Sequence, residues 1–357
     1  MGNHRYGLIM AGGRGTRFWP RSRKRTAKQV LKFFGDRTLI QQTVDRLTGV
    51  LDPADIWVLT NDLLQSEIRN QLNEVPRQQI FAEPAQRNTA PCVALAAHML
   101  HEADPDAIMG VFPADHLILK EPRFRNFVKA AFRAAEKHDV VVLGIQPRWA
   151  ETGYGYIEFP RDVTPGLLQP VSVSSFREKP DARTAKRFVE RGNFYWNAGM
   201  FFWRVAVVLD LIRKYQPKTA TLLASLPPVK SKKFLPGLAE AYPLCDNISI
   251  DYAIIEKAKS VAGFAVDDIG WSDVGSWEAV YNLAEKDENA NAAQNGLIAE
   301  ASRGNYVDSN RLVALVGVEN LVIVDTPDAL LIADRRKAQD VSKVVKALET
   351  NQREDLL

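Results

Sequence analysis

Short apolar runs alternate with segments of helical periodicity along the chain as far as about Lys286. This alternation predicts a parallel β-sheet covered by helices, because helical crossovers join consecutive parallel strands. Thr89 followed by Pro91 predicts a helix with Thr89 as its N-cap. The predicted strands are residues 6–11, 55–60, 79–82, 107–113 and 140–145. Helical repeats are Leu39, Thr43, Leu47 and Leu51; Leu64, Ile68 and Leu72; and Phe124, Phe127, Val128 and Ala131.

The pattern changes after Lys286, where the polar segment NANAAQNG leads into closely spaced β-rich runs. Such runs fit either a small sandwich or a fragment of a β-helix, and periodicity does not decide between them. We expect a catalytic domain at 1–286 and a small β domain with a closing amphipathic helix at 287–357. The runs lie near 297 and 306 and at 312–318, 321–325 and 329–333, and the helix contains Val341, Val344, Val345 and Leu348.

Composition narrows the class of protein. The chain has 357 residues, 46% hydrophobic and 25% charged, which is typical of a soluble globular protein. Its net charge of +3 does not favour nucleic acid, and no apolar run reaches the roughly 18 residues of a membrane helix. Cys92 and Cys245 lack a CxxC spacing, so we expect buried thiols rather than zinc or disulfide sites. A cytoplasmic enzyme is the default expectation.

The segment LIMAGGRGTRFWP, residues 8–20, places a glycine-rich loop directly after the first predicted strand. Backbone amides can converge on an anion at such a loop. Phe18 stands where a dinucleotide fingerprint needs its third glycine, and no GK[ST] follows, so neither a nicotinamide loop nor a Walker loop fits.

The loop belongs to a basic run that includes Arg14, Arg17 and Lys28 and contains no acidic residue. A glycine turn is often only a tight turn, and a basic run is commonly a solvated surface. Together they predict a polyphosphate site, because Gly12, Gly13 and their neighbours permit close backbone approach while the cations neutralise the phosphates.

Two aspartates lie in loops that suit a metal ion. Asp115 follows an apolar strand in VFPADH, at the sheet edge where open α/β sheets bind ligands, and Asp273 lies in GWSDVGSW. An isolated PADH aspartate is more commonly a turn or cap residue. As a pair, the two carboxylates suit Mg²⁺, which takes its remaining ligands from water and substrate phosphates.

Further polar segments fit substrate contacts: EPAQRNTAP (83–91), GYGYIEF (153–159), FREKP (176–180) and FYWNAGMFFWR (194–204). Glu178 and Lys179 could bind a sugar hydroxyl and a phosphate, and Asn197 offers an amide to ring hydroxyls. The alternative is that these segments have structural roles only, because a solvated strand end, a turn and aromatic residues of the core would give the same sequence pattern.

These segments, together with Lys28-Gln29, WNAGMF, SIDYAIIEK and WSDVGSW, occur in the order found in sugar nucleotidyltransferases. The sequence resembles that family, and within it the mannose-1-phosphate guanylyltransferases. The resemblance implies an α/β, Rossmann-like domain with a mostly parallel mixed sheet, a small C-terminal all-β domain that is a short left-handed β-helix, Mg²⁺ dependence and a homodimer. It also implies transfer of GMP from GTP to mannose 1-phosphate, giving GDP-mannose and pyrophosphate.

The resemblance assigns roles to individual residues. The nucleophile would be a sugar phosphate that is already ionised, so a general base is not required. A nucleotidyltransferase for another hexose phosphate or base, and a catalytically silent paralogue, remain alternatives. Catalytic roles fall on Arg14, Arg17, Lys28, Asp115 and Asp273, with the two aspartates as metal ligands; nucleotide binding on Ala11, Gly12, Gly13, Glu83, Asn88 and Thr89; and sugar-phosphate binding on Tyr154, Gly155, Glu178, Lys179 and Asn197.

Overall fold

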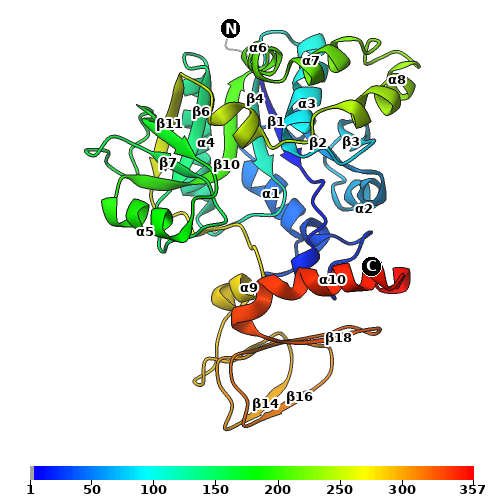
Figure 1. Ribbon diagram of the computed structural model, residues 1–357, viewed down its shortest axis with the longest axis vertical. Helices are drawn as coiled ribbons and strands as arrows, with labels where there is room; N and C mark the ends of the chain where they lie inside the picture. The colour runs from blue at the N-terminus through cyan, green and yellow to red at the C-terminus, as the bar shows by residue number, and fades with distance from the viewer. Residues whose placement is uncertain (1–3) are drawn as a thin grey trace.

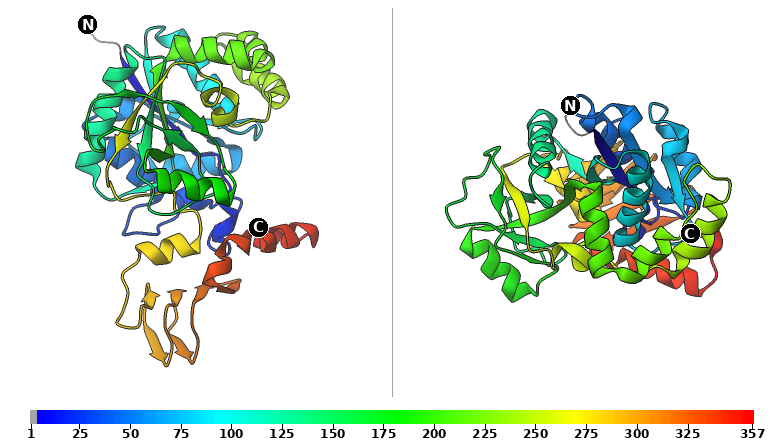
Figure 2. Two further views of the ribbon diagram at one scale, coloured as in Figure 1. Left: turned by 60° about the vertical axis from the view of Figure 1, so that its left-hand side comes forward. Right: turned by 90° about the horizontal axis from the view of Figure 1, so that it is seen from above.

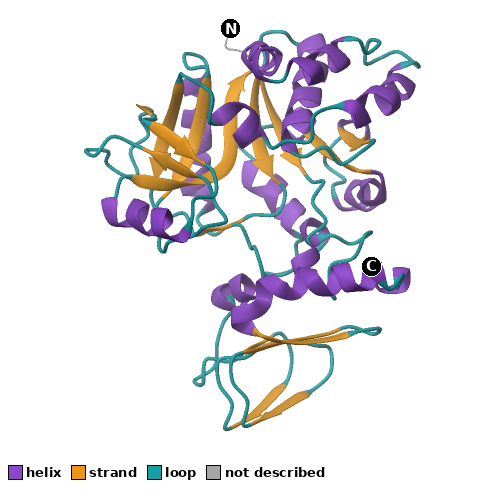
Figure 3. Ribbon diagram, viewed as in Figure 1, coloured by secondary structure: helices purple, strands orange, loops and turns teal. Residues whose placement is uncertain are grey.

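The computed structural model describes residues 4–357, which form a broad α/β layer and a smaller coil of short strands at one end of it (Figure 1). Figure 3 shows the strands of the α/β layer as one twisted sheet with helices on both faces. Two helices, α9 (Trp277–Leu283) and α10 (Val341–Thr350), lie between this layer and the coil. In residues 4–357 no helix is long and apolar enough to cross a membrane.

The central sheet has ten strands, and its main path runs β3-β2-β1-β4-β10-β6-β11-β8. β1 is parallel to β2 and β4, and β6 is parallel to β11. β10 runs antiparallel between β4 and β6, so the predicted mostly parallel mixed sheet is confirmed. The strands are β1 (Arg5–Met10), β2 (Ile56–Asn61), β3 (Ile80–Glu83), β4 (Ile108–Pro113), β6 (Val140–Ile145), β7 (Tyr156–Glu158), β8 (Val171–Ser172), β9 (Ser175–Arg177), β10 (Phe194–Arg204) and β11 (Val261–Val266); β5 (Leu117–Ile118) and β12 (Trp271–Ser272) form a separate pair.

Successive side chains of the central strands enter two different cores, because they alternate across the sheet. Ile9 and Val141 pack with α1, α2 and α4 on one face, whereas Leu8 and Val142 pack with α3, α6 and α8 on the other. The helices are α1 (Leu39–Leu47), α2 (Asp62–Gln71), α3 (Thr89–Ala103), α4 (Glu121–Ala135), α5 (Ala182–Arg191), α6 (Val205–Tyr215), α7 (Pro217–Ala224) and α8 (Phe234–Ala241).

The five predicted strands agree with the structure to within one residue at each end. The predicted N-cap Thr89 is wrong by one position: α3 begins at Thr89, and Asn88 is the N-cap, with its Oδ1 accepting from Thr89 N at 2.9 Å. The segment 194–204 is the core strand β10, in which a bulge between Asn197 and Phe201 interrupts the pairing with β6. Both buried cysteines are free thiols, as predicted.

The C-terminal strands form a parallel coil, which decides the alternative between a sandwich and a β-helix. β13, β15 and β17 pair in parallel, and β14 pairs in parallel with β16, so consecutive strands alternate between two sheets. β18 then turns back antiparallel to β17. The β-helix is confirmed, and its left hand stays a prediction. The strands are β13 (Ala292–Ala293), β14 (Leu297–Glu300), β15 (Tyr306–Asp308), β16 (Val313–Val316), β17 (Leu321–Asp325) and β18 (Leu330–Asp334).

The end of the chain packs against the segment that follows β1. Figure 2 shows α10, in red, beside the blue segment that contains Thr16–Phe18, and a shared hydrophobic core joins them. Trp19 Nε1 donates to the carbonyl of Leu356 at 3.0 Å, and Lys24 pairs with Glu354 at 2.5 Å. Trp277 of α9 also belongs to this core. The predicted domain boundary at 286 follows α9, and it stays a prediction.

Candidate active site

A cleft of about 680 Å³ opens beyond the carboxyl ends of β1, β3 and β4. Open α/β sheets bind ligands at this edge, where the loops that follow parallel strands converge. Of the predicted site residues, Arg17 and Lys28 do not line the cleft. The predicted residues that line it are Ala11, Gly12, Gly13, Arg14, Glu83, Asn88, Thr89, Asp115, Tyr154, Gly155, Glu178, Lys179, Asn197 and Asp273.

The glycine-rich loop is held from behind by a side-chain amide. Gln29 Nε2 donates to the carbonyls of Ala11 at 2.7 Å and Gly13 at 3.0 Å. Gly15 has a φ of 62°, and a Cβ there would lie 2.6 Å from the Cβ of Lys28, so this position requires glycine. A Cβ at Gly13 would meet nothing within 4 Å. The front of the loop is therefore open to a ligand while its back is fixed.

Lys28 joins the two predicted metal-binding aspartates from behind the cleft. The side chain of Lys28 is buried; Nζ lies 2.9 Å from Asp115 Oδ2 and donates to the backbone carbonyl of Asp273 at 2.5 Å. Tyr154 OH donates to Asp273 Oδ1 at 2.6 Å. Burial alone would raise the pKa of Asp115, but the charge of Lys28 and its hydrogen bond to this carboxylate hold the pKa below its ordinary value. Asp115 is thus kept as a carboxylate.

The pair Asp115 and Asp273 fits one Mg²⁺ by its donor chemistry. Both side chains line the same cleft as the glycine-rich loop. Within residues 4–357 no cluster of three or more His, Cys, Asp and Glu side chains could hold a metal by itself. Mg²⁺ suits such an incomplete site, because it prefers one or two carboxylates and completes its shell with water and substrate phosphates.

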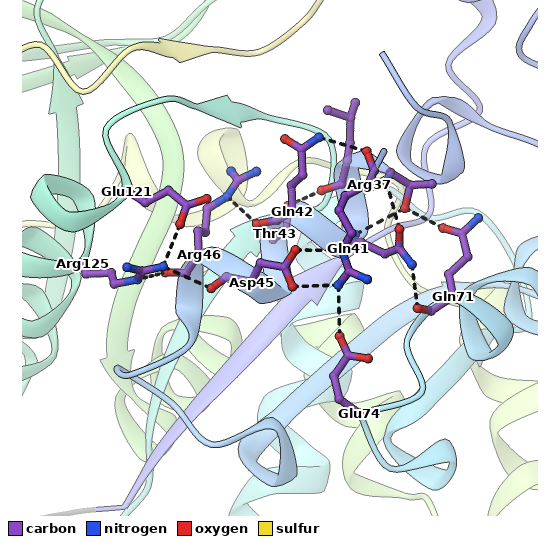
Figure 4. Close-up of polar contacts among 12 residues, drawn as sticks. Arg37, Gln41, Gln42, Thr43, Asp45, Arg46, Gln71, Glu74, Glu121 and Arg125 are labelled. Atoms are coloured by element: carbon purple, nitrogen blue, oxygen red, sulfur yellow. Dashed lines mark hydrogen bonds and ion pairs between the residues drawn. The ribbon is translucent and has the colours of Figure 1, made fainter. Parts of the chain in front are cut away.

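Helix α1 fixes the loop that carries Asp115 by binding the carbonyls on both sides of it. Arg46 Nη2 donates to the carbonyl of His116 at 2.8 Å, and Thr43 Oγ1 lies 3.3 Å from that of Ala114, as a second acceptor beside the carbonyl of Leu39 at 2.9 Å. Figure 4 shows Thr43 and Arg46 within the polar network that runs along α1. Burial lowers the pKa of Arg46 to about 10, which still leaves it charged at neutral pH. The carboxylate is therefore presented by a rigid loop.

Of the three cations predicted to bind the triphosphate, Arg14 lines the cleft. Its Nη2 forms an ion pair with Glu349 of α10 at 2.6 Å, and both side chains are more than one third exposed. Such an exposed pair is weak, so a triphosphate can displace it. Arg17 instead donates to the carbonyl of Gly275 at 3.4 Å, in the loop that carries Asp273. Lys28 is buried, whereas Arg17 is exposed but lies outside the lining of the cleft. Direct phosphate contacts by these two residues stay a prediction.

One end of the cleft contains Glu83, Asn88 and Thr89, which the sequence predicts to bind the nucleotide. Glu83 accepts a hydrogen bond from Tyr242 OH, and burial raises the pKa of Glu83 to about 7 despite this bond. Thr89 Oγ1 accepts from Ile250 N at 2.8 Å. Asn88 has a φ of 65° and a ψ of −168°, a strained backbone conformation that residues other than glycine rarely adopt. Nucleotide binding by Glu83, Asn88 and Thr89 stays a prediction.

The opposite end of the cleft contains the predicted sugar-phosphate residues. A Cβ at Gly155 would lie 2.4 Å from Glu178 Oε2, so only glycine permits this carboxylate to approach so closely. Lys179 Nζ lies 3.4 Å from Glu178 Oε1. Asn197 is already engaged: Nδ2 donates to Asp251 Oδ1 at 2.8 Å, and Oδ1 accepts from Gly199 N at 3.0 Å.

Sequence reasoning gave no role to several cleft residues. Asp251 belongs to SIDYAIIEK, which the sequence analysis noted as a motif without assigning a function to it. A polar residue inside a noted motif was the available signal. The other unassigned polar residues of the cleft include Gln29, Asn61, Gln86, Arg87, His116, Asn247 and Trp271.

Comparison with known proteins places this architecture in a family. The model for the family described as nucleotidyl transferase matches residues 6–290, and a MannoseP isomerase/GMP-like beta-helix domain matches residues 301–348. The chain belongs to the nucleotidyl transferase family. The relatives that it matches include mannose-1-phosphate guanylyltransferases, so the family resemblance of the sequence is confirmed.

The similarity to these relatives extends over nearly the whole chain. Mannose-1-phosphate guanylyltransferase from Klebsiella pneumoniae is 38% identical over 98% of this chain and 74% of its own length. The alginate biosynthesis protein AlgA of Pseudomonas aeruginosa is 37% identical over 98% of this chain and 73% of its own. A crystal structure described as mannose-1-phosphate geranyltransferase, from Thermus thermophilus, superposes with a TM-score of 0.85 at 31% identity, covering 97% of this chain and 99% of that one.

Proposed function

We propose that this protein transfers GMP from GTP to mannose 1-phosphate, giving GDP-mannose and pyrophosphate. The observation that carries the proposal is the cleft itself. It combines an open glycine-rich loop, the pair Asp115 and Asp273 and the polar end around Glu178 in one continuous space. The substrates follow from the names of the relatives, which are mannose-1-phosphate guanylyltransferases.

The reaction requires two anions to be held in line, with a phosphate oxygen of the sugar phosphate attacking the α-phosphorus of GTP. In the proposed site, Gly12, Gly13 and Arg14 bind the triphosphate, and Lys179 binds the sugar phosphate. Asp115 and Asp273 would hold Mg²⁺, which supplies charge neutralisation for the phosphates and the departing pyrophosphate.

His116 does not act as a base in this mechanism. Burial lowers its pKa to about 4, so it is neutral at physiological pH. Its Nδ1 accepts a hydrogen bond from Trp271 Nε1 at 3.3 Å. An imidazole held in this way orients the loop after β4 instead of exchanging protons, and an ionised phosphate nucleophile needs no proton acceptor.

A matrix of nucleoside triphosphates and hexose 1-phosphates tests the proposal. With Mg²⁺ present, pyrophosphate release is measured for GTP, ATP and UTP, each with mannose, glucose and galactose 1-phosphate. We expect GTP with mannose 1-phosphate to have the highest kcat/KM, by about tenfold or more, and EDTA to abolish turnover until Mg²⁺ is restored. A higher value for another pair would assign a different specificity. Absence of pyrophosphate with every pair would identify a silent paralogue.

We also propose that the protein is a homodimer joined through its C-terminal coil. Ile298 and Val316 are 58% and 72% exposed, and the alternation along β14 and β16 places them on one outer face. Leu312, directly before β16, is 66% exposed. Exposed apolar patches of this kind mark subunit contacts.

The oligomeric state is measured by light scattering. We expect a mass of about twice the 39.9 kDa of one chain, and a single-chain mass for Val316→Lys. Leu235→Lys, at a similarly exposed leucine of α8, is the matched control and keeps the larger mass. A wild-type mass of one chain contradicts the dimer.

A further inference from the structure

The segment SIDYAIIEK, residues 249–257, connects the two ends of the cleft. Ile250 N donates to Thr89 Oγ1 at 2.8 Å on the side of the proposed nucleotide site. Asp251 Oδ1 accepts from Asn197 Nδ2 at 2.8 Å, and Glu256 Oε1 accepts from Glu178 N at 2.9 Å, both at the sugar end. The segment is therefore part of the wall of the site.

Its backbone has an unusual conformation that accounts for these contacts. Residues Asp251–Ile255 form a π-helical turn, and Glu256 N donates to the carbonyl of Asp251 at 3.0 Å. Residues five apart lie on different faces of an α-helix, whereas the π turn brings them together. Asp251 and Glu256 can thus both reach the loops of the sugar end. π turns occur frequently at functional sites.

We propose that Asp251 is a specificity-determining residue that accepts a hydrogen bond from a hydroxyl of the hexose, beside Glu178. Asp251 lines the cleft and holds Asn197 with one carboxylate oxygen. Two hydrogen bonds already use half of the capacity of the Asn197 amide, because its carbonyl oxygen accepts from Gly199 N and one of its N–H groups donates to Asp251. The carboxylates of Asp251 and Glu178 therefore offer most of the acceptor sites at this end of the cleft.

The environment supports this role. Burial raises the pKa of Asp251 to about 6 and that of Glu178 to about 7, so both carboxyls carry a desolvation cost in the free protein. The hydroxyl groups of a bound hexose would donate hydrogen bonds to the carboxylate oxygens of Asp251 and Glu178, which are partly shielded from water. Asp251 thereby takes over part of the hydroxyl recognition that the sequence assigned to Asn197. The inference rests on the proposed use of a sugar phosphate.

The test compares Asp251→Asn with Asp246→Asn, using wild-type turnover of GTP and mannose 1-phosphate as the baseline. Asparagine at 251 keeps an oxygen for Asn197 but loses the charge and half of the acceptor capacity. We expect its KM for mannose 1-phosphate to rise about 10- to 100-fold, with the KM for GTP within about twofold of wild type. Asp246 carries a carboxylate shortly before the segment, does not line the cleft and contacts Thr219, so its variant keeps both constants.

Monodeoxy analogues of mannose 1-phosphate distinguish a direct contact from a structural role. If Asp251 binds one hydroxyl, the analogue that lacks this hydroxyl loses affinity with wild type and loses little more with Asp251→Asn. An unchanged KM in the variant would overturn the inference. So would independent effects, in which the loss of affinity from the variant and the loss from the analogue multiply for every analogue tested. Thermal melting checks that the variant is folded. Failure of wild type to use mannose 1-phosphate would instead reject the proposed function.

Discussion

Asp273→Asn and Asp115→Asn each reduce kcat by about 100- to 1000-fold while the protein remains folded. Each substitution removes one of the two charges that face the proposed Mg²⁺, but leaves a side chain of the same shape. Tyr154 can still donate to the remaining oxygen at 273, so the local structure is retained. The rate is measured as pyrophosphate release at saturating GTP and mannose 1-phosphate, over a range of Mg²⁺ concentrations.

Asp268→Asn is the matched control for this pair. Asp268 lies five positions before Asp273, is well exposed and pairs with Lys120 at 2.6 Å. Its loss removes a surface ion pair of small energetic value, so activity stays within about twofold of wild type. Near-normal turnover of Asp115→Asn or Asp273→Asn without added Mg²⁺ would contradict the metal assignment, as would an equal loss in all three variants.

Lys28→Ala should reduce both activity and stability, because Lys28 is a buried partner of Asp115 and not a surface cation. Its loss leaves Asp115 without the ammonium 2.9 Å away and removes the donor to the carbonyl of Asp273. We expect kcat to fall by about 100-fold or more. Unfolding free energy should fall by about 1–3 kcal/mol, less than for a fully buried pair, since the Asp115 side chain is 37% exposed.

Two further variants distinguish the effect of the buried position of Lys28 from that of its positive charge. Lys28→Arg should not restore activity, because the ammonium of Lys28 reaches both Asp115 Oδ2 and the carbonyl of Asp273 in a buried position, where a planar guanidinium presents its donors in a different geometry. Arg25→Ala, at an exposed residue of the same basic run, should leave turnover and thermal unfolding unchanged. Equal effects of Lys28→Ala and Arg25→Ala would show that the run is a solvated surface.

The amino-acid sequence by itself determined the elements and the loops of the site. Strands such as Val140–Ile145 are short apolar runs that are buried on both sides of the sheet, and their limits follow from local composition. The glycine-rich loop and Asp115 were recognisable because each directly follows such a strand. Carboxyl ends of parallel strands meet at one edge, so these residues were expected to converge on one cleft, where the structure places them.

Only the tertiary structure decided which residue each charged side chain contacts. Lys28 and Arg14 belong to one basic run, yet Lys28 is buried against Asp115 and the carbonyl of Asp273, while Arg14 lies in the cleft and pairs with Glu349. The contact of Asp251 with Asn197 joins residues 54 positions apart. Such contacts depend on how strands and helices pack, and local periodicity carries no information about that packing. The sequence therefore defined the main loops that meet at the cleft, and the fold decided which of their side chains line it and which hold the others in place.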